Sequence, residues 1–148
     1  MRVLIIFALL LLAYTVLGQT VPDPKLTPGV TRKVSKKELC TAGSTKDARL
    51  VSAKTKGLVF SRYGFVKGKF KPGDYEIDHF ISLELGGAND INNLWPQPYH
   101  GEATARQKDV VETNLHHRIC KNLLTVAEAQ AIIRTDWFSE YKKIKGLK

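Results

Sequence analysis

The chain has 148 residues and a formal net charge of +9 at pH 7. This length excludes a large multidomain protein and allows one domain with a small addition. The positive charge favours polyanionic partners such as nucleic acid or anionic lipid and glycan surfaces, although a basic surface can also serve solubility alone.

Residues 1–18 have the pattern of a secretory signal peptide. Met1-Arg2 gives a positive start, and the apolar run from Val3 to Leu12 is too short to span a bilayer. Small or modest residues at Val16-Leu17-Gly18 stand where cleavage is expected. No later stretch is apolar enough to cross a membrane, so we expect a secreted, soluble mature chain with no membrane association after cleavage.

Residues 19–45 are predicted to form an extended basic arm. Three prolines and a glycine lie between positions 22 and 29, and they interrupt any helical or strand periodicity. A short helical turn is predicted at Ser35–Cys40. The basic pairs Arg32-Lys33 and Lys36-Lys37 either contact phosphates or belong to a solvated tail, and the sequence leaves both readings open.

The chain has two cysteines, Cys40 and Cys120. Export places them in an oxidising environment, where a single disulfide is the natural reading. Thiol chemistry or a metal site is less well supported because no Cys-x-x-Cys spacing is present. We therefore predict a disulfide that ties the N-terminal arm to a late helix.

Residues 46–138 are predicted to be the folded domain, and 139–148 a frayed basic tail. Apolar residues at helical spacing predict helices at 51–63 and 102–121. Gly64 fits the left-handed position after the first helix. A basic loop should follow, from Phe65 to Gly73. Thr125-x-x-Glu128 has the pattern of a capping box and predicts the start of a third helix.

The most informative stretch joins a short β-prone run to an Asp78-His79 pair. Glu76 stands two residues before Asp78 and so lies on the same strand face as Asp78. A carboxylate suits Mg²⁺, Ca²⁺ or Mn²⁺, and an imidazole suits proton abstraction from water near neutral pH. The pair Gly86-Gly87 should let the chain reverse tightly, and Asn93 can fold back to orient the His79 segment. The alternative is a capped strand end with a surface histidine.

The stretch YEIDHFISLELGGANDINNLWPQPY resembles the HNH endonuclease superfamily, whose pattern runs acidic-His, Gly-Gly, then Asn-Leu. Weaker matches to small bacterial HNH endonucleases follow in order from Asp23 to Trp137. The resemblance implies an α+β fold with a ββα-metal hairpin-and-helix core and additional helices. It also implies a divalent metal, cleavage of DNA, His79 as general base, Asp78 as first metal ligand and Asn93 as the orienting residue. RNA is the other nucleic acid that such an enzyme could cleave.

The resemblance places a further metal ligand on the helix after the Pro-Gln-Pro-Tyr turn. At the expected position this chain has Thr104, which is a poor ligand for a lone divalent ion. His100 or Glu102 could substitute from the same loop, with Glu76 supporting the site. Without a substitute, the fold and the basic surface would persist while catalysis is lost.

Two functions follow from these observations. The first is a secreted HNH-type endonuclease that hydrolyses phosphodiester bonds. The alternative is a catalytically impaired secreted effector on the same scaffold, which binds nucleic acid or a nuclear or chromatin partner after delivery into a host cell. Metal discriminates between them, because an enzyme loses activity with a chelator and with His79→Ala whereas a binder is indifferent to both.

Overall fold

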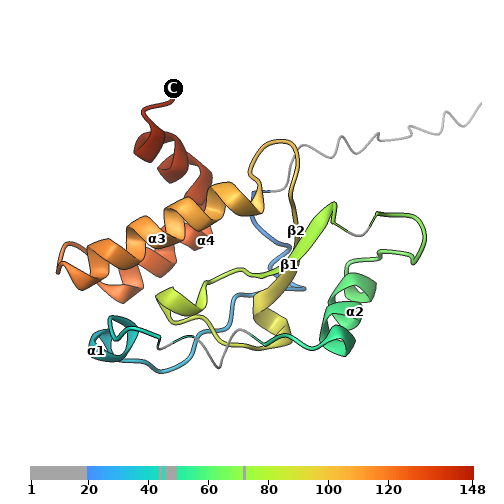
Figure 1. The fold of residues 1–148 in the computed structure, drawn as a ribbon, viewed down its shortest axis with the longest axis horizontal. Helices are drawn as coiled ribbons and strands as arrows, with labels where there is room; N and C mark the ends of the chain where they lie inside the picture. The colour runs from blue at the N-terminus through green and yellow to red at the C-terminus, as the bar shows by residue number, and fades with distance from the viewer. Residues whose placement is uncertain (1–19, 44, 46–49, 72) are drawn as a thin grey trace, which may run out of the picture.

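The computed structural model describes residues 20–43, 45, 50–71 and 73–148, so the expected signal peptide lies outside the described residues. This part of the chain is an α+β structure with four α-helices and one antiparallel two-stranded sheet (Figure 1). The elements are α1 (Lys36–Leu39), α2 (Ala53–Arg62), β1 (Tyr75–His79), β2 (Leu94–Pro98), α3 (Ala105–Cys120) and α4 (Val126–Lys145).

Strands β1 and β2 pair in a register that sets Ile77 opposite Pro96 and His79 opposite Leu94. The connection between them contains two short 3₁₀ helices, η2 (Leu83–Leu85) and η3 (Ile91–Asn93). The expected tight reversal at the glycine pair is therefore wrong. Residues 80–93, called the excursion below, form a long connection instead, because apolar side chains of this segment pack into the main core.

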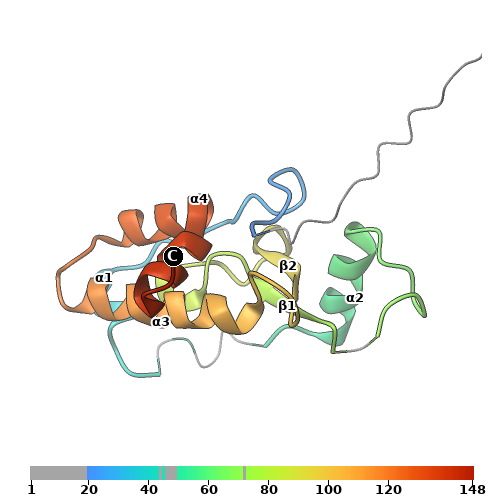
Figure 2. The ribbon, with the colours of Figure 1, turned by 90° about the horizontal axis from the view of Figure 1, so that it is seen from above.

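The main core lies where α3 and α4 pack against the excursion between the strands (Figure 2). Helix α3 contributes residues at four-residue spacing, as its sequence predicts. The fully buried members from the two helices are Val111, Leu115, Ile119, Ala129, Ile133 and Trp137. Ile81 and Leu85 complete this core from the excursion, which fixes the end of β1 against α3.

The predicted helix ends are confirmed at three places. Thr125 and Glu128 form the capping box that opens α4. Helix α1 occupies the predicted helical turn, and α2 ends before Gly64, whose φ is +75°. Helix α3 begins slightly later than predicted, because Thr104 is its N-cap and bonds Gln107.

The predicted frayed tail is wrong, because α4 continues to Lys145 with a break at Asp136. Tyr141 and Ile144 pack against the main core, and Glu140 forms a 2.8 Å ion pair with Arg118 on α3. Sparse apolar residues are sufficient to hold this segment once a partner helix lies beside it.

The Cys40–Cys120 disulfide is present and joins the end of α1 to the end of α3. The N-terminal arm lies on the body of the protein. Thr31 forms an isolated bridge with Gly87, and the Arg134 guanidinium donates to the carbonyls of Pro28 and Gly29. Among the described residues, no helix has the length and apolar character that a membrane span requires.

Candidate functional site

A cleft of about 490 Å³ opens between β1, the start of the excursion and α3. It brings together three of the residues singled out in the sequence, Glu76, Asp78 and His79. Its remaining lining residues come from β1, from η2 and its N-cap, from α3 and from the α2 region. These residues are Val51, Lys56, Ile77, Ser82, Leu83, Glu84, Asp109, Glu112 and Thr113.

The cleft is acidic although the molecule is basic. Five carboxylates line it, and Lys56 is the one lysine or arginine among its lining residues. The five are Glu76, Asp78, Glu84, Asp109 and Glu112. Oxygen donors of this kind are the ligands that hard divalent cations prefer, and the surplus of negative charge favours such a cation over an anion.

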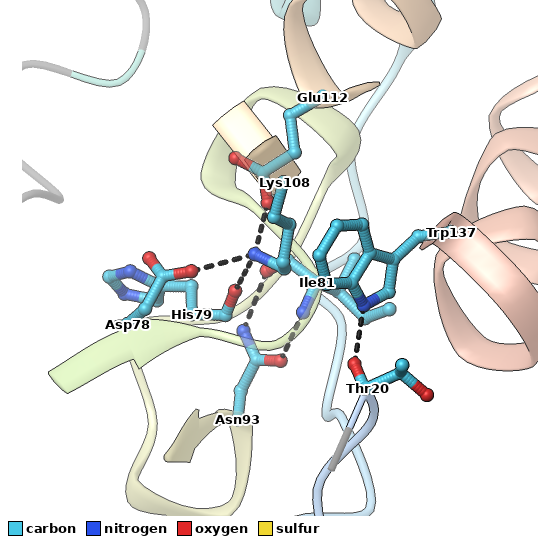
Figure 3. Close-up of polar contacts among 8 residues, drawn as sticks. All are labelled: Thr20, Asp78, His79, Ile81, Asn93, Lys108, Glu112 and Trp137. Atoms are coloured by element: carbon cyan, nitrogen blue, oxygen red, sulfur yellow. Dashed lines mark hydrogen bonds and ion pairs between the residues drawn. The ribbon is translucent and has the colours of Figure 1, made fainter. Parts of the chain in front are cut away.

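Lys108 lies behind the cleft and joins α3 to β1 (Figure 3). Its ammonium is fully buried and donates to Asp78 Oδ2 at 2.7 Å, to the His79 carbonyl at 2.8 Å and to Glu112 Oε1. All three N–H groups of the ammonium thus have an oxygen acceptor, which is what allows a lysine to be buried. The contact fixes one oxygen of Asp78 and the backbone of His79.

Burial and neighbouring charges shift the pKa values of the titratable groups in and around this cluster. Burial raises the pKa of Glu112 above its ordinary value, against the lowering effect of Lys108. For Lys108, burial alone would lower the pKa, but the charges of Asp78 and Glu112 outweigh it and raise the pKa. Burial likewise raises the pKa of Glu76, while burial and the neighbouring Glu76 raise the pKa of Tyr99 to about 12.

His79 stands at the end of β1 with its ring in contact with Asn89. The distance from His79 Nε2 to Asn89 Oδ1 is 3.0 Å, and Asn89 Nδ2 donates to the Leu50 carbonyl. Because an amide oxygen only accepts, this orientation assigns the ring proton to Nε2 and the basic lone pair to Nδ1. The contact therefore selects the tautomer of the candidate base.

Asn93 holds the backbone just beyond His79, as Figure 3 shows. Its Oδ1 accepts from Ile81 N–H, its Nδ2 donates to the Ile81 and Ala88 carbonyls, and its own carbonyl accepts from Phe80 N–H. The side chain is fully buried. Asn93 and Lys108 together satisfy the polar backbone groups where the chain leaves β1, so they define the direction of His79.

The glycine pair makes this arrangement possible. Gly86 has a φ of +84° and ends η2 in the left-handed conformation. A Cβ at Gly87 would lie 1.7 Å from the Ile81 carbonyl oxygen and 2.8 Å from Asn93 Nδ2. Gly87 is therefore required for the close approach of two backbone segments, whereas the sequence had indicated a tight turn between strands.

Three residues predicted as metal ligands do not line the cleft. Thr104 is buried at the start of α3, where its backbone N–H and its hydroxyl both donate to Gln107 Oε1. His100 and Glu102 are exposed in the loop before α3 and are absent from the cleft lining. The helix instead offers Asp109 and Glu112, about one and two turns further along.

Sequence reasoning missed Lys108 and Glu112. A signal was present, because these charged residues stand four positions apart and share the helix face of Val111 and Leu115. A charged pair on a core-facing stripe indicates a buried ion pair, which is rarely retained without a structural or functional reason.

One further group of possible metal ligands is engaged elsewhere. Cys40, His116 and Cys120 have ligand atoms within 4.8 Å of one another, the one such group of three found among the described residues. The two sulfurs are joined as a disulfide, and His116 Nε2 bonds the Leu39 carbonyl. This group stabilises the fold and holds no free thiolate for a metal.

Comparisons with protein-family models, with curated proteins and with solved structures find no match for this chain.

Proposed function

We propose that this protein is a secreted, metal-dependent endonuclease of the HNH, or ββα-metal, type, which hydrolyses phosphodiester bonds of DNA. One observation carries the proposal. An antiparallel hairpin followed by a helix sets Asp78 and His79 of β1 opposite the carboxylates of α3 across a single cleft. Metal-assisted hydrolysis requires at least a ligand for a hard cation and, beside it, a general base that works near neutral pH.

The types of donor in the cleft suit a divalent cation, although among the described residues no three Asp, Glu or His ligand atoms of the cleft lie within 4.8 Å of one another. An ion bound there would draw these side chains closer together. Asp78 would hold it from β1, and Asp109 and Glu112 are the carboxylates of α3 that line the same cleft. Glu112 already pairs with Lys108 through Oε1, so its other oxygen would be the ligand. The Ser82 hydroxyl also lines this cleft and is buried with no hydrogen-bond partner in the described structure. When bound, such an ion stabilises negative charge on the phosphate and on the leaving oxygen.

His79 supplies the base in this proposal. Nδ1 would take a proton from the attacking water, while Nε2–H remains bonded to Asn89. Asn93 and Lys108 act through the backbone by holding the segment that carries the ring. Both are positioning residues, and neither needs to touch the substrate.

A plasmid-nicking assay on the mature, oxidised protein tests the proposal. With Mg²⁺ or Mn²⁺ we expect nicking that EDTA abolishes and that His79→Ala reduces by at least about 100-fold. His117→Ala is the matched control, because His117 is exposed on α3 and absent from the cleft lining. Nicking that survives both EDTA and His79→Ala would refute the mechanism.

A second function is favoured by the Lys108 contact. Because the ammonium already holds one oxygen of Asp78, the scaffold is also suited to a protein that binds nucleic acid, or a nuclear partner in a host cell, without a metal. Folded protein that retards DNA without cleaving it, equally with EDTA and with His79→Ala, would favour this binding effector over the endonuclease.

A further inference from the structure

Positive charge is concentrated in α2 and in the loop that follows it. Residues 53–74 contain six lysine and arginine side chains and one aspartate, a net charge of +5 within a chain of +9. The six are Lys54, Lys56, Arg62, Lys67, Lys69 and Lys71. This asymmetry is large enough to direct a polyanion toward one end of the molecule.

The loop is held in a defined shape by an aromatic cluster. The ring of Phe65 contacts those of Phe60, Phe70 and Tyr75, with centroids 4.8–5.4 Å apart. Phe60 and Phe70 also contact each other at 4.8 Å. The rings pack on one another and are partly buried, so Lys67, Lys69 and Lys71 are left as the exposed groups at alternate positions.

Backbone hydrogen bonds support the same shape. Lys69 N–H donates to the Val66 carbonyl at 3.0 Å, and Lys71 N–H donates to Asp74 Oδ2 at 3.1 Å. Asp74 N–H in turn donates to the Lys71 carbonyl. A loop pinned in this way loses little conformational entropy on binding, and only the lysine side chains need to be ordered.

Helix α2 and the loop that follows it border the candidate site. Lys56 lines the cleft from α2, and the loop leads directly into β1, which carries Asp78 and His79. Figures 1 and 2 place α2 and this loop at the far end of the molecule from the C-terminal end of α4. A duplex that contacts the loop would therefore pass beside the cleft.

We propose that Lys67, Lys69 and Lys71 bind the phosphate backbone of a DNA duplex and align it with the cleft, with Lys56 as the innermost contact. The inference rests on the proposed function. The cleft carboxylates outnumber Lys56 and Lys108 and so repel a polyanion, which means that the attraction for DNA must come from positive charge beside the cleft. Exposed apolar side chains that would anchor the loop in lipid are limited to Val66 among its described residues.

The test compares two triple variants with the same change in net charge. Lys67→Gln/Lys69→Gln/Lys71→Gln alters the loop, and Lys143→Gln/Lys145→Gln/Lys148→Gln alters exposed lysines at the C-terminal end of the chain, which lies away from α2. Affinity for a short DNA duplex is measured by fluorescence anisotropy in EDTA, over about 50–200 mM salt. Thermal unfolding of each variant checks that the fold is unchanged.

We expect the loop variant to bind at least about tenfold more weakly, with a slope of log affinity against log salt that is shallower by about 2–3. The C-terminal variant should change affinity less than about twofold. Equal losses in both variants, or none in the loop variant, would overturn the proposal. So would vesicles of anionic lipid that lose binding to the loop variant while DNA binding is unaffected.

Binding in EDTA separates this inference from the nuclease proposal. If the protein never cleaves DNA but the loop variant alone loses affinity, the interaction surface stands and the catalytic proposal fails. If the protein nicks plasmid but both triple variants bind equally, the nuclease stands and this surface is wrong.

Discussion

Gly87 is the residue on which the packing of the excursion depends most closely. A Cβ there would overlap the Ile81 carbonyl oxygen and would also crowd Asn93 Nδ2, both of which belong to the segment that follows His79. Backbone cannot move aside as a flexible side chain can. We therefore expect Gly87→Ala to lower the free energy of unfolding by about 2–4 kcal/mol, measured by urea denaturation.

Gly57 provides the matched control, because it lies inside α2 and a Cβ added there would meet no atom within 4 Å. Gly57→Ala should raise stability by about 0.5–1 kcal/mol, since alanine favours the helix. If Gly87→Ala behaves like Gly57→Ala, the close approach that places Asn93 does not exist in solution.

At the same scale, local pattern predicts some site residues and misses others. Asp78 and His79 are adjacent in sequence, so one strand end brings both to the cleft. The α3 carboxylates depend on where that helix begins and on its tilt against the hairpin, which spacing alone does not determine. Lys108 is missed for a further reason: lysine is normally exposed, and its burial depends on three oxygens gathered from two elements.

At the scale of elements, α4 contains a cap in its middle. The backbone of Asp136 is non-helical, with a φ of −159°, and its Oδ1 accepts from Ser139 N–H at 3.0 Å. This bond satisfies a donor that the break would otherwise leave unpaired. We expect Asp136→Ala to cost about 1 kcal/mol of stability at pH 7, measured by urea denaturation.

The cost should depend on pH in a defined direction. Hydrogen bonds from the Ser139 side chain and backbone lower the pKa of Asp136. A carboxyl whose pKa is lower in the folded state contributes stability that is present above its ordinary pKa and lost as pH falls through the lowered value. The difference between wild type and Asp136→Ala should therefore shrink in acid. Asp136→Asn keeps a cap without a titrating group, so its free energy of unfolding should differ from that of Asp136→Ala by an amount that does not change with pH. A difference between wild type and Asp136→Ala that is the same at every pH would contradict the charged cap.

Elements with local signals are predictable from the sequence, and those held by distant packing are not. Thr125 and Glu128, which lie within four residues of each other, predict the start of α4. Its end is different, because the lysines after Tyr141 favour a solvated tail. The helix continues there through contact with the core, the ion pair of Glu140 with Arg118 and the left-handed C-cap at Gly146. The path of the excursion between β1 and β2 is likewise determined by the packing of its side chains into the main core.

At the scale of the whole molecule, charge is sorted by position. Helix α2 and the loop that follows it are strongly basic, whereas the adjoining cleft presents five carboxylates. Lys56 and the buried Lys108 offset part of this negative charge, and the carboxylates that exceed them repel each other in the folded protein and separate on unfolding. A cation that binds there relieves this repulsion only in the folded state, so it should raise the stability of the entire fold.

We therefore expect Mn²⁺ or Mg²⁺ to raise the midpoint of thermal unfolding in the absence of any substrate. A cation at about one hundred times its Kd adds about 2.7 kcal/mol if it binds the folded state alone. The added stability should persist in His79→Ala, because the base is not required to hold the ion, and should largely disappear in Asp78→Asn. The increment is compared within each variant, since Asp78→Asn also weakens the contact with Lys108. NaCl at matched ionic strength controls for screening, and an equal rise with NaCl or in Asp78→Asn would show that the cleft holds no specific cation.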